Sequence, residues 1–384
     1  MESRRVRGYI SRMNTRRLIA LGTLAVFLAS MAAAQATVGV VSYIEGGVDV
    51  SRNGEFLDPD LIEIGLTIEE FDTVETGPNG YVEVEMTAPS AGSLVKVRPD
   101  TAFYFEGTPR ESSRFRTTFQ LLRGSLALKV GKLTSGESFG VQTDTAVMAV
   151  RGTEFNVDMA PDRSVLVSVP EGRVESQTDT RTVMAQPGTV AAIDERASMS
   201  AVAVEAEDID LYREYWRGLR LEALKINARL SIQQYARQWD QQLPRLENAM
   251  RELGSHDEIF RRWIRVARGQ ADPPATGQAV RDKRALSRGM LELRAVLPVA
   301  ERTFQTLVGL EEAYRDGYAE GPFMAGSYRN AAAFYRSFQA DKAKMRRMLS
   351  AARWMIRIYR VIDRQAGGFP DSGGSGLMST LPAL

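Results

Sequence analysis

Apolar and polar residues alternate along the first half of the chain and change to a helical spacing in the second half. Tyr81 to Met86 and Glu154 to Val157 alternate with the period of two that is typical of half-buried strands. From Ile209 onward, apolar residues instead recur every three or four positions, as on one face of a packed helix. The pattern predicts a multi-domain α and β protein with an all-β module over residues 37–200 and a helical domain over 201–366.

Glycines divide the β-rich half into short segments. A glycine followed by an alternating run recurs at Gly124, Gly152, Gly172 and Gly188, at intervals of 28, 20 and 16 residues. These intervals are too irregular for a strict repeat, but they suit a short, imperfect β-solenoid or a twisted sandwich in which glycines occupy the corners.

The clearest of these corners is the run Arg151-Gly152-Thr153, which separates the apolar segment 146–150 from a strand containing Phe155. Glycine permits a positive φ angle or a close backbone approach at no steric cost. We therefore interpret Gly152 as a structural corner, with a ligand loop as the alternative.

Five motifs occur in a fixed order around this corner. They are 77-GPNGYVEV-84, 97-VRPDT-101, 121-LLRG-124, 150-VRGTEF-155 and 169-VPEGRV-174. Together they resemble the FecR domain over roughly residues 38 to 195. The resemblance implies a β-helix-like coil, and it makes Gly124, Arg151, Gly152, Thr153, Phe155 and Gly172 the structural motif residues.

The second half contains several long amphipathic patterns. One follows Ile209, Tyr212, Trp216, Leu219, Ala223, Ile226 and Leu230, and it shifts its phase before Leu253. A short helix is expected over 257–268, and two more long helices over 286–314 and 331–359, with kinks or breaks at Pro244 and Pro298. Single apolar stripes with coiled-coil-like spacing require mutual packing, so we expect a helical bundle or long helical hairpins. The glycine-rich tail 367–384 is expected to be disordered.

The N-terminus has the features of an export signal. Six arginines precede the apolar run Leu18 to Ala34, which ends in Ala34-Gln35-Ala36. This arrangement predicts a signal peptide over residues 1–36 that is cleaved near Ala36, with a retained membrane anchor as the alternative. The best-known FecR-like proteins have a cytoplasmic segment before a membrane helix. The short stretch before Leu18 therefore makes this chain similar to a stand-alone exported type, located in the periplasm or cell envelope.

Charge is distributed unevenly between the two predicted domains. Residues 37–200 contain 14 basic and 25 acidic side chains, a net charge of −11, whereas residues 201–384 contain 29 and 22, a net charge of +7. Opposite charges favour mutual approach or recognition of different partners, and plain solvated faces are the other interpretation. The break in pattern at 196–205 suggests little shared core, so we expect independent folding and a weak, salt-sensitive contact.

Residues typical of enzyme sites are scarce. The chain has no cysteine, and its only histidine, His256, follows a Gly-Ser helix-ending turn. Phosphate-binding loops and nucleophile elbows are also absent. We therefore expect a non-catalytic protein with no cofactor and no metal.

One set of residues is a candidate ligand surface. Phe103, Tyr104 and Phe105 on one strand, followed by Arg114, are suited to stacking a sugar or holding an anion, although such residues more often fill a core. Export argues against nucleic acid as a partner. We expect an envelope protein partner in scaffolding or signal relay. The alternative is glycan binding, with peptidoglycan or an anionic membrane surface as accessible partners.

Overall fold

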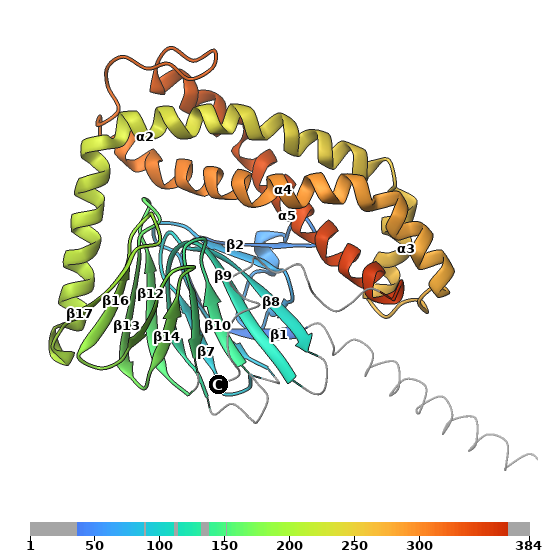
Figure 1. Cartoon of the computed structure of the whole chain (residues 1–384), viewed down its shortest axis with the longest axis horizontal. Coiled ribbons are helices and arrows are strands. Elements are labelled where there is room, and N and C mark those ends of the chain that lie inside the picture. Colours follow the sequence, from blue (N-terminus) through green and yellow to red (C-terminus); the bar gives the residue numbers. More distant parts are fainter. Residues whose placement is uncertain (1–36, 88–89, 111–113, 132–137, 151, 368–384) are drawn as a thin grey trace, which may run out of the picture.

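The protein was analysed as a computed structural model, which describes residues 37–87, 90–110, 114–131, 138–150 and 152–367. The predicted signal peptide and the glycine-rich tail after Gly367 lie outside these residues. Within the described residues, the first half consists of strands and the second half of four helices (Figure 1).

The strands form two layers. Layer A contains β4 (Thr67–Glu69), β1 (Thr37–Glu45), β6 (Tyr81–Met86), β7 (Leu94–Val97), β9 (Arg114–Lys129), β12 (Glu154–Met159), β13 (Val165–Glu171), β16 (Thr189–Ile193) and β17 (Met199–Ala203), in that spatial order. Layer B contains β3 (Glu55–Phe56), β2 (Val48–Arg52), β5 (Thr73–Thr76), β8 (Ala102–Arg110), β9, β10 (Ser138–Gln142), β11 (Val147–Val150), β14 (Val174–Gln177) and β15 (Thr182–Ala185).

Strand β9 belongs to both layers. Its first part pairs with β8 and β10 in layer B, and from Gly124 onward it pairs with β7 and β12 in layer A. Gly124 has φ +91°, and a Cβ atom there would lie 2.3 Å from the Thr101 Oγ1 atom. Only glycine fits this crossing between layers.

The ladders are antiparallel except for the β9–β10 pair. They form an open, two-layered sheet, so the predicted β-helix or solenoid is not confirmed. The alternation of the sequence explains the core: Phe155 and Val157 point between the layers, where they are fully buried. A row of phenylalanines crosses this core, with ring centroids 4.9 to 5.0 Å apart from Phe103 through Phe105 and Phe119 to Phe139.

The helices are α2 (Ile209–Gly254), α3 (Asp257–Ala267), α4 (Thr276–Arg315) and α5 (Ala331–Gln365). They share a second large core that includes Trp239, Phe304 and Phe338. Long, mutually packed helices were expected, whereas a coiled coil is not established. Among the described residues, no helix is long and apolar enough to span a membrane.

Helices α2 and α4 continue through Pro244 and Pro298, where the sequence led us to expect kinks or breaks. Both prolines lie on exposed positions of their helices. A proline removes one backbone hydrogen bond, and on a solvent-facing side water can satisfy the carbonyl group that is left.

The helical part contacts the β part on three sides. The first turns of α2 cover layer A, α4 crosses the ends of the strands, and α5 lies on the outer face of layer B. Figure 1 shows α2 rising beside β17 and then bending to run above the strands, next to α4. The two halves therefore form an extensive contact.

Candidate functional site

The family motifs around the glycine corners hold the two layers together. Three buried threonine hydroxyls donate to backbone carbonyls of a following turn: Thr76 to Arg98 (2.6 Å), Thr101 to Ser125 (3.2 Å) and Thr153 to Arg173 (3.1 Å). The motif threonines thus fasten the places where the chain changes direction. These contacts give the motifs a structural role.

Gly152 and Gly172 both have positive φ angles, of +62° and +91°. A Cβ atom on Gly172 would lie 2.8 Å from the Thr153 Oγ1 atom, whereas a Cβ atom on Gly152 would have no neighbour within 4 Å. Arg151 lies outside the described residues. The expected φ > 0 corner at Gly152 is thus present.

The candidate ligand surface is dispersed by the fold. Phe103 and Phe105 are completely buried in the β core. Tyr104 points to the opposite face of the strand, where the guanidinium group of Arg353 lies 5.1 Å from its ring centroid. The side chain of Arg114 is outside the described part of the chain. The strand therefore presents its aromatic residues to the core and to α5, not to a ligand.

Helix α5 binds layer B through a row of arginines on one face. Arg346 contacts Asp49 (2.8 Å) and Glu75 (3.1 Å), Arg353 contacts Glu301 and Thr73, Arg357 contacts Glu70 (3.5 Å) and Arg360 contacts Glu106. The spacing of three, four and seven residues places these arginines on the same side of the helix. Part of the opposite net charge of the two halves is therefore paired within the chain.

Among these carboxyl groups, Glu301 is buried and Glu70 is half-buried. Burial raises the pKa of Glu301 above its ordinary value, although the neighbouring Arg353 acts in the opposite direction. Burial likewise raises the pKa of Glu70, with Arg357 opposing. A buried carboxylate that lost its arginine would be left without a counter-charge. Glu70 follows β4, so its contact with Arg357 joins the two halves, whereas Glu301 lies on α4 and its contact with Arg353 joins two helices.

A second charged cluster lies where α2 meets layer A. Asp158 on β12 is almost fully buried and accepts hydrogen bonds from Arg213 (2.7 and 3.1 Å), Arg217 (2.7 Å) and the hydroxyl of Ser125 (2.5 Å). Burial alone raises the pKa of Asp158, but the bonds from Arg213 and Ser125 and the charge of Arg217 outweigh it, so the pKa lies below its ordinary value. Asp158 is therefore ionised at neutral pH.

Beside this cluster lies a cavity of about 250 Å³, lined by Arg98, Asp210, Arg213, Glu214 and Arg217. Arg98 follows β7, and its guanidinium group donates one long hydrogen bond, of 3.4 Å, to the side-chain oxygen of Asn156. Burial, together with the charges of Arg213 and Arg217, lowers the pKa of Arg98. Guanidinium groups from both halves of the chain thus meet at one cavity.

The sequence analysis missed this cluster, although a signal was present. Asp158 lies on the face of β12 opposite to Phe155 and Val157, whose side chains point into the β core. Arg213 lies on the buried face of α2, between Ile209 and Trp216 in the sequence. Two charged residues of opposite sign at buried positions indicate an ion pair, but the pattern alone cannot match the partners.

Near the same junction, the two halves share an apolar cluster of Ala160, Leu166, Val190, Val204, Ile209 and Trp216. The expectation of little shared core is therefore wrong at this boundary. The outer face of β13, β16 and β17 carries apolar residues that the first turns of α2 cover. Independent folding of each half stays a prediction.

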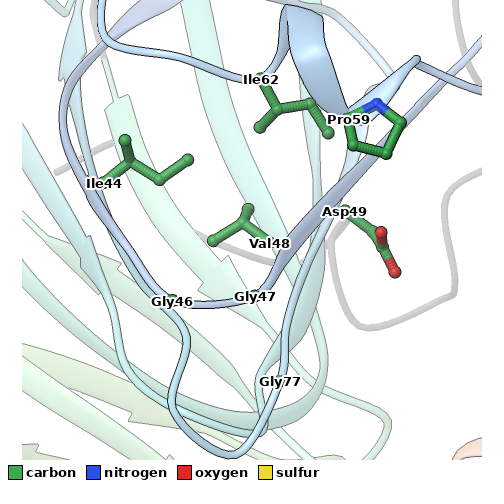
Figure 2. A pocket seen from close by; sticks show the side chains of 8 residues that line it. All are labelled: Ile44, Gly46, Gly47, Val48, Asp49, Pro59, Ile62 and Gly77. Carbon is green, nitrogen blue, oxygen red and sulfur yellow. The ribbon is translucent and has the colours of Figure 1, made fainter.

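A hollow of about 380 Å³ lies beside the turn between β1 and β2. Its lining residues are Ile44, Gly46, Gly47, Val48, Asp49, Pro59, Ile62 and Gly77. Figure 2 shows Ile44, Val48 and Ile62 around the hollow, with the carboxyl group of Asp49 directed away from them. Because Asp49 binds Arg346, this hollow offers no free reactive group.

The outward side of α2 carries an unusual surface. Five large apolar side chains, Leu211, Tyr215, Leu219, Ile226 and Leu230, are 50 to 82% exposed. Their spacing of four, four, seven and four places them in one stripe, which we call the α2 stripe. The sequence analysis assigned Leu219, Ile226 and Leu230 to the packed face; that assignment was wrong because the helix buries Arg213, Leu224, Ala228 and Ile232 instead.

The described residues contain no cluster of three or more acidic or histidine side chains that could hold a metal ion. His256 precedes the first turn of α3 and makes no side-chain hydrogen bond there.

Comparison with known proteins agrees with the motif analysis. Residues 72–175 match the family model described as FecR protein. Two crystal structures, at 1.65 and 2.50 Å resolution, of a protein assigned as an anti-sigma factor from Parabacteroides distasonis ATCC 8503 are also similar. Each is 20% identical over 36% of this chain, with a TM-score of 0.31, and this chain spans 63% and 62% of their lengths. No match is found among curated proteins.

Proposed function

Because residues 72–175 form a FecR domain, we propose that this chain is a non-catalytic protein of the cell envelope that takes part in signalling by binding another envelope protein. The single observation that carries the binding role is the α2 stripe. Large apolar side chains that gather on one exposed face commonly mark an interaction surface.

The loop after α4 enlarges this surface. Arg229 of α2 donates to the carbonyl of Pro322 (2.5 Å), and the ammonium group of Lys225 lies 5.2 Å from the ring centroid of Tyr318. Tyr318 and Met324 are themselves exposed, by 46 and 73%. The stripe and this loop together hold seven of the thirteen exposed large apolar residues in the described part of the chain.

The partner that fits is an amphipathic helix of a different protein. Its apolar side would cover the α2 stripe, as in other helix-in-groove interactions. Acidic residues Asp210 and Glu214 flank the first half of the stripe, and Lys225 and Arg229 flank the second half. A complementary helix therefore has basic residues opposite the first half and acidic residues opposite the second.

Export and localisation are part of the proposal. The arginine-rich start and the Ala34-Gln35-Ala36 ending support cleavage near Ala36 and placement in the periplasm or envelope. The glycan-binding alternative has less support, because its aromatic platform is buried at Phe103 and Phe105.

The test is photo-crosslinking in intact cells. A photoreactive residue replaces Ile226 in the stripe or, as a matched control, Leu291, which is 75% exposed on α4 and isolated from the stripe. We expect one discrete crosslinked product, containing a different envelope protein, from position 226 and none from position 291.

Three results would contradict the proposal. They are no product at position 226, equal products at both positions, or a product with the mass of two copies of this chain. Ile226→Glu should also abolish the product formed from a photoreactive residue at Leu219, whereas Leu291→Glu should not.

A further inference from the structure

The cavity between Arg98 and the first turns of α2 has the chemistry of a small ligand site. Its lining includes three arginines, Arg98, Arg213 and Arg217, of which Arg213 is buried and Arg217 is half exposed. Asp158 accepts hydrogen bonds of 2.7 to 3.1 Å from Arg213 and Arg217, and its single negative charge offsets one of their two positive charges. Arg98 has no ion-pair partner among the described residues, so its charge is available to a ligand.

The rim of the cavity carries the opposite charge. Asp210 contacts Arg213 (2.9 Å), but its side chain is 89% exposed. Glu214 also lines the cavity, lies on the surface, and has no ion-pair partner among the described residues. The cavity therefore offers a cation inside and a carboxylate at the mouth.

This arrangement selects against a simple anion. A phosphate or other multiply charged anion would be attracted by Arg98 but repelled by Glu214 and Asp210. A ligand with one carboxylate and one ammonium group satisfies both ends, and a guanidinium group binds a carboxylate with matched, fork-like geometry.

The volume limits the size of the ligand. The cavity has a volume of about 250 Å³. That is below the usual size of sites for drug-sized molecules. A small molecule that carries both charges, on two groups bonded to the same carbon atom, is a free α-amino acid.

We propose that this cavity binds a free α-amino acid, with its carboxylate on Arg98 and its ammonium group on Glu214. The walls come from the β part and from α2, so a bound amino acid would touch both halves of the chain. The cavity adjoins the first half of the α2 stripe, because Asp210 and Glu214 line the cavity and also flank the stripe. Binding of an amino acid to the purified chain does not require the proposed protein partner.

The test is isothermal titration calorimetry of the purified full chain with the common L-amino acids and D-alanine at millimolar concentrations. Propionate and ethylamine serve as controls, since each carries only one of the two charges. We expect heat of binding from at least one amino acid and from neither control.

Two substitutions test the assigned roles. Arg98→Gln and Glu214→Gln should each weaken binding by roughly tenfold to a hundredfold, the effect of losing one charge-assisted hydrogen bond. Arg196→Gln is the matched control, because Arg196 is 87% exposed and distant in sequence from both elements that form the cavity, and it should leave the Kd unchanged. Glu214 lies on the surface, so its variant remains informative even if Arg98→Gln impairs folding.

The proposal fails if no amino acid binds, or if propionate binds as tightly as the amino acid, which would indicate a simple anion site. It also fails if Glu214→Gln leaves the affinity unchanged, or if Arg196→Gln weakens it as much as the cavity variants do.

Discussion

Replacing Asp158 with asparagine should strongly destabilise the protein. The side chain of Asp158 is 2% exposed, and it is the only carboxylate that contacts both Arg213 and Arg217 among the described residues. Asparagine has nearly the same shape but no charge. The guanidinium group of Arg213, which is 4% exposed, would keep only the solvent-exposed Asp210 as its acidic partner.

Removing one member of a buried ion pair typically costs about 3 to 5 kcal/mol, because the remaining charge stays buried without compensation. With an unfolding entropy of about 2.1 cal/mol/K per residue over roughly 320 described residues, this corresponds to a fall in Tm of about 4 to 8 °C for a single transition. Urea denaturation followed by circular dichroism measures the free energy directly.

An exposed acidic residue on the same strand, Glu154, serves as a control for the loss of a charge without burial. Glu154 on β12 faces Lys129 at 3.8 Å, and both side chains are about half exposed or more. Exposed pairs contribute under about 1 kcal/mol, so Glu154→Gln should be nearly neutral. In the double variant Asp158→Asn with Arg213→Met, the orphaned charge is gone, and much of the lost stability should return.

The effect of Asp158→Asn should also depend on pH. Since the folded-state pKa of Asp158 lies below its ordinary value, its ionised form contributes stability that is present above the unfolded pKa of 3.8 and is lost as the pH falls through the folded pKa. Wild type and variant should therefore converge in strongly acidic solution. A loss below about 1 kcal/mol at neutral pH would refute the argument from the buried pair.

Three further predictions follow from other features. Gly172→Ala should cost more free energy of unfolding than Gly152→Ala, for which about 1 to 2 kcal/mol is expected from the positive φ angle alone, because only the first creates a contact with Thr153; equal losses in urea denaturation would contradict this. Burial raises the pKa of Asp72 to about 6, although Arg52 opposes it, so protonation of Asp72 should add stability as the pH falls from about 7 toward 4. This dependence, up to about 3 kcal/mol, should disappear from pH-dependent urea curves of Asp72→Asn, and an unchanged curve would count against it. Intact-mass measurement of envelope-derived protein should give a mature chain starting near Thr37, and a mass that includes Leu18 to Ala34 would instead support a retained anchor.

The sequence was most informative where local pattern and local structure coincide. The period-two alternation correctly identified Phe155 and Val157 as core residues. The expectation of a half-buried strand is wrong, because Asn156 and Asp158 on the opposite face are only 7% and 2% exposed. The positive φ at Gly152 also followed from local chemistry, because the preceding and following segments both read as strands. Helical spacing identified α3 nearly to both ends, but α4 begins ten residues before the predicted start and α5 continues six residues beyond the predicted end.

Long-range pairing could not be predicted in the same way. Arg346, Arg353, Arg357 and Arg360 looked like an ordinary charged back of α5, because their partners on layer B lie more than 200 residues away in the chain. The buried face of α2 was also misassigned after Trp216, because the predicted stripe continued through Leu219 and Ile226 whereas the helix buries Leu224 and Ala228. Spacing alone does not decide which of two apolar stripes is packed.

The shared strand β9 constrains how the protein can respond to a signal. Because one continuous segment carries hydrogen-bonded neighbours in both layers, the layers cannot slide or hinge against each other without breaking a ladder. The β part is therefore mechanically a single block. In the proposed signalling role, movement between parts of the chain is then confined to the places where α2 and α5 contact the β part through arginine–carboxylate pairs.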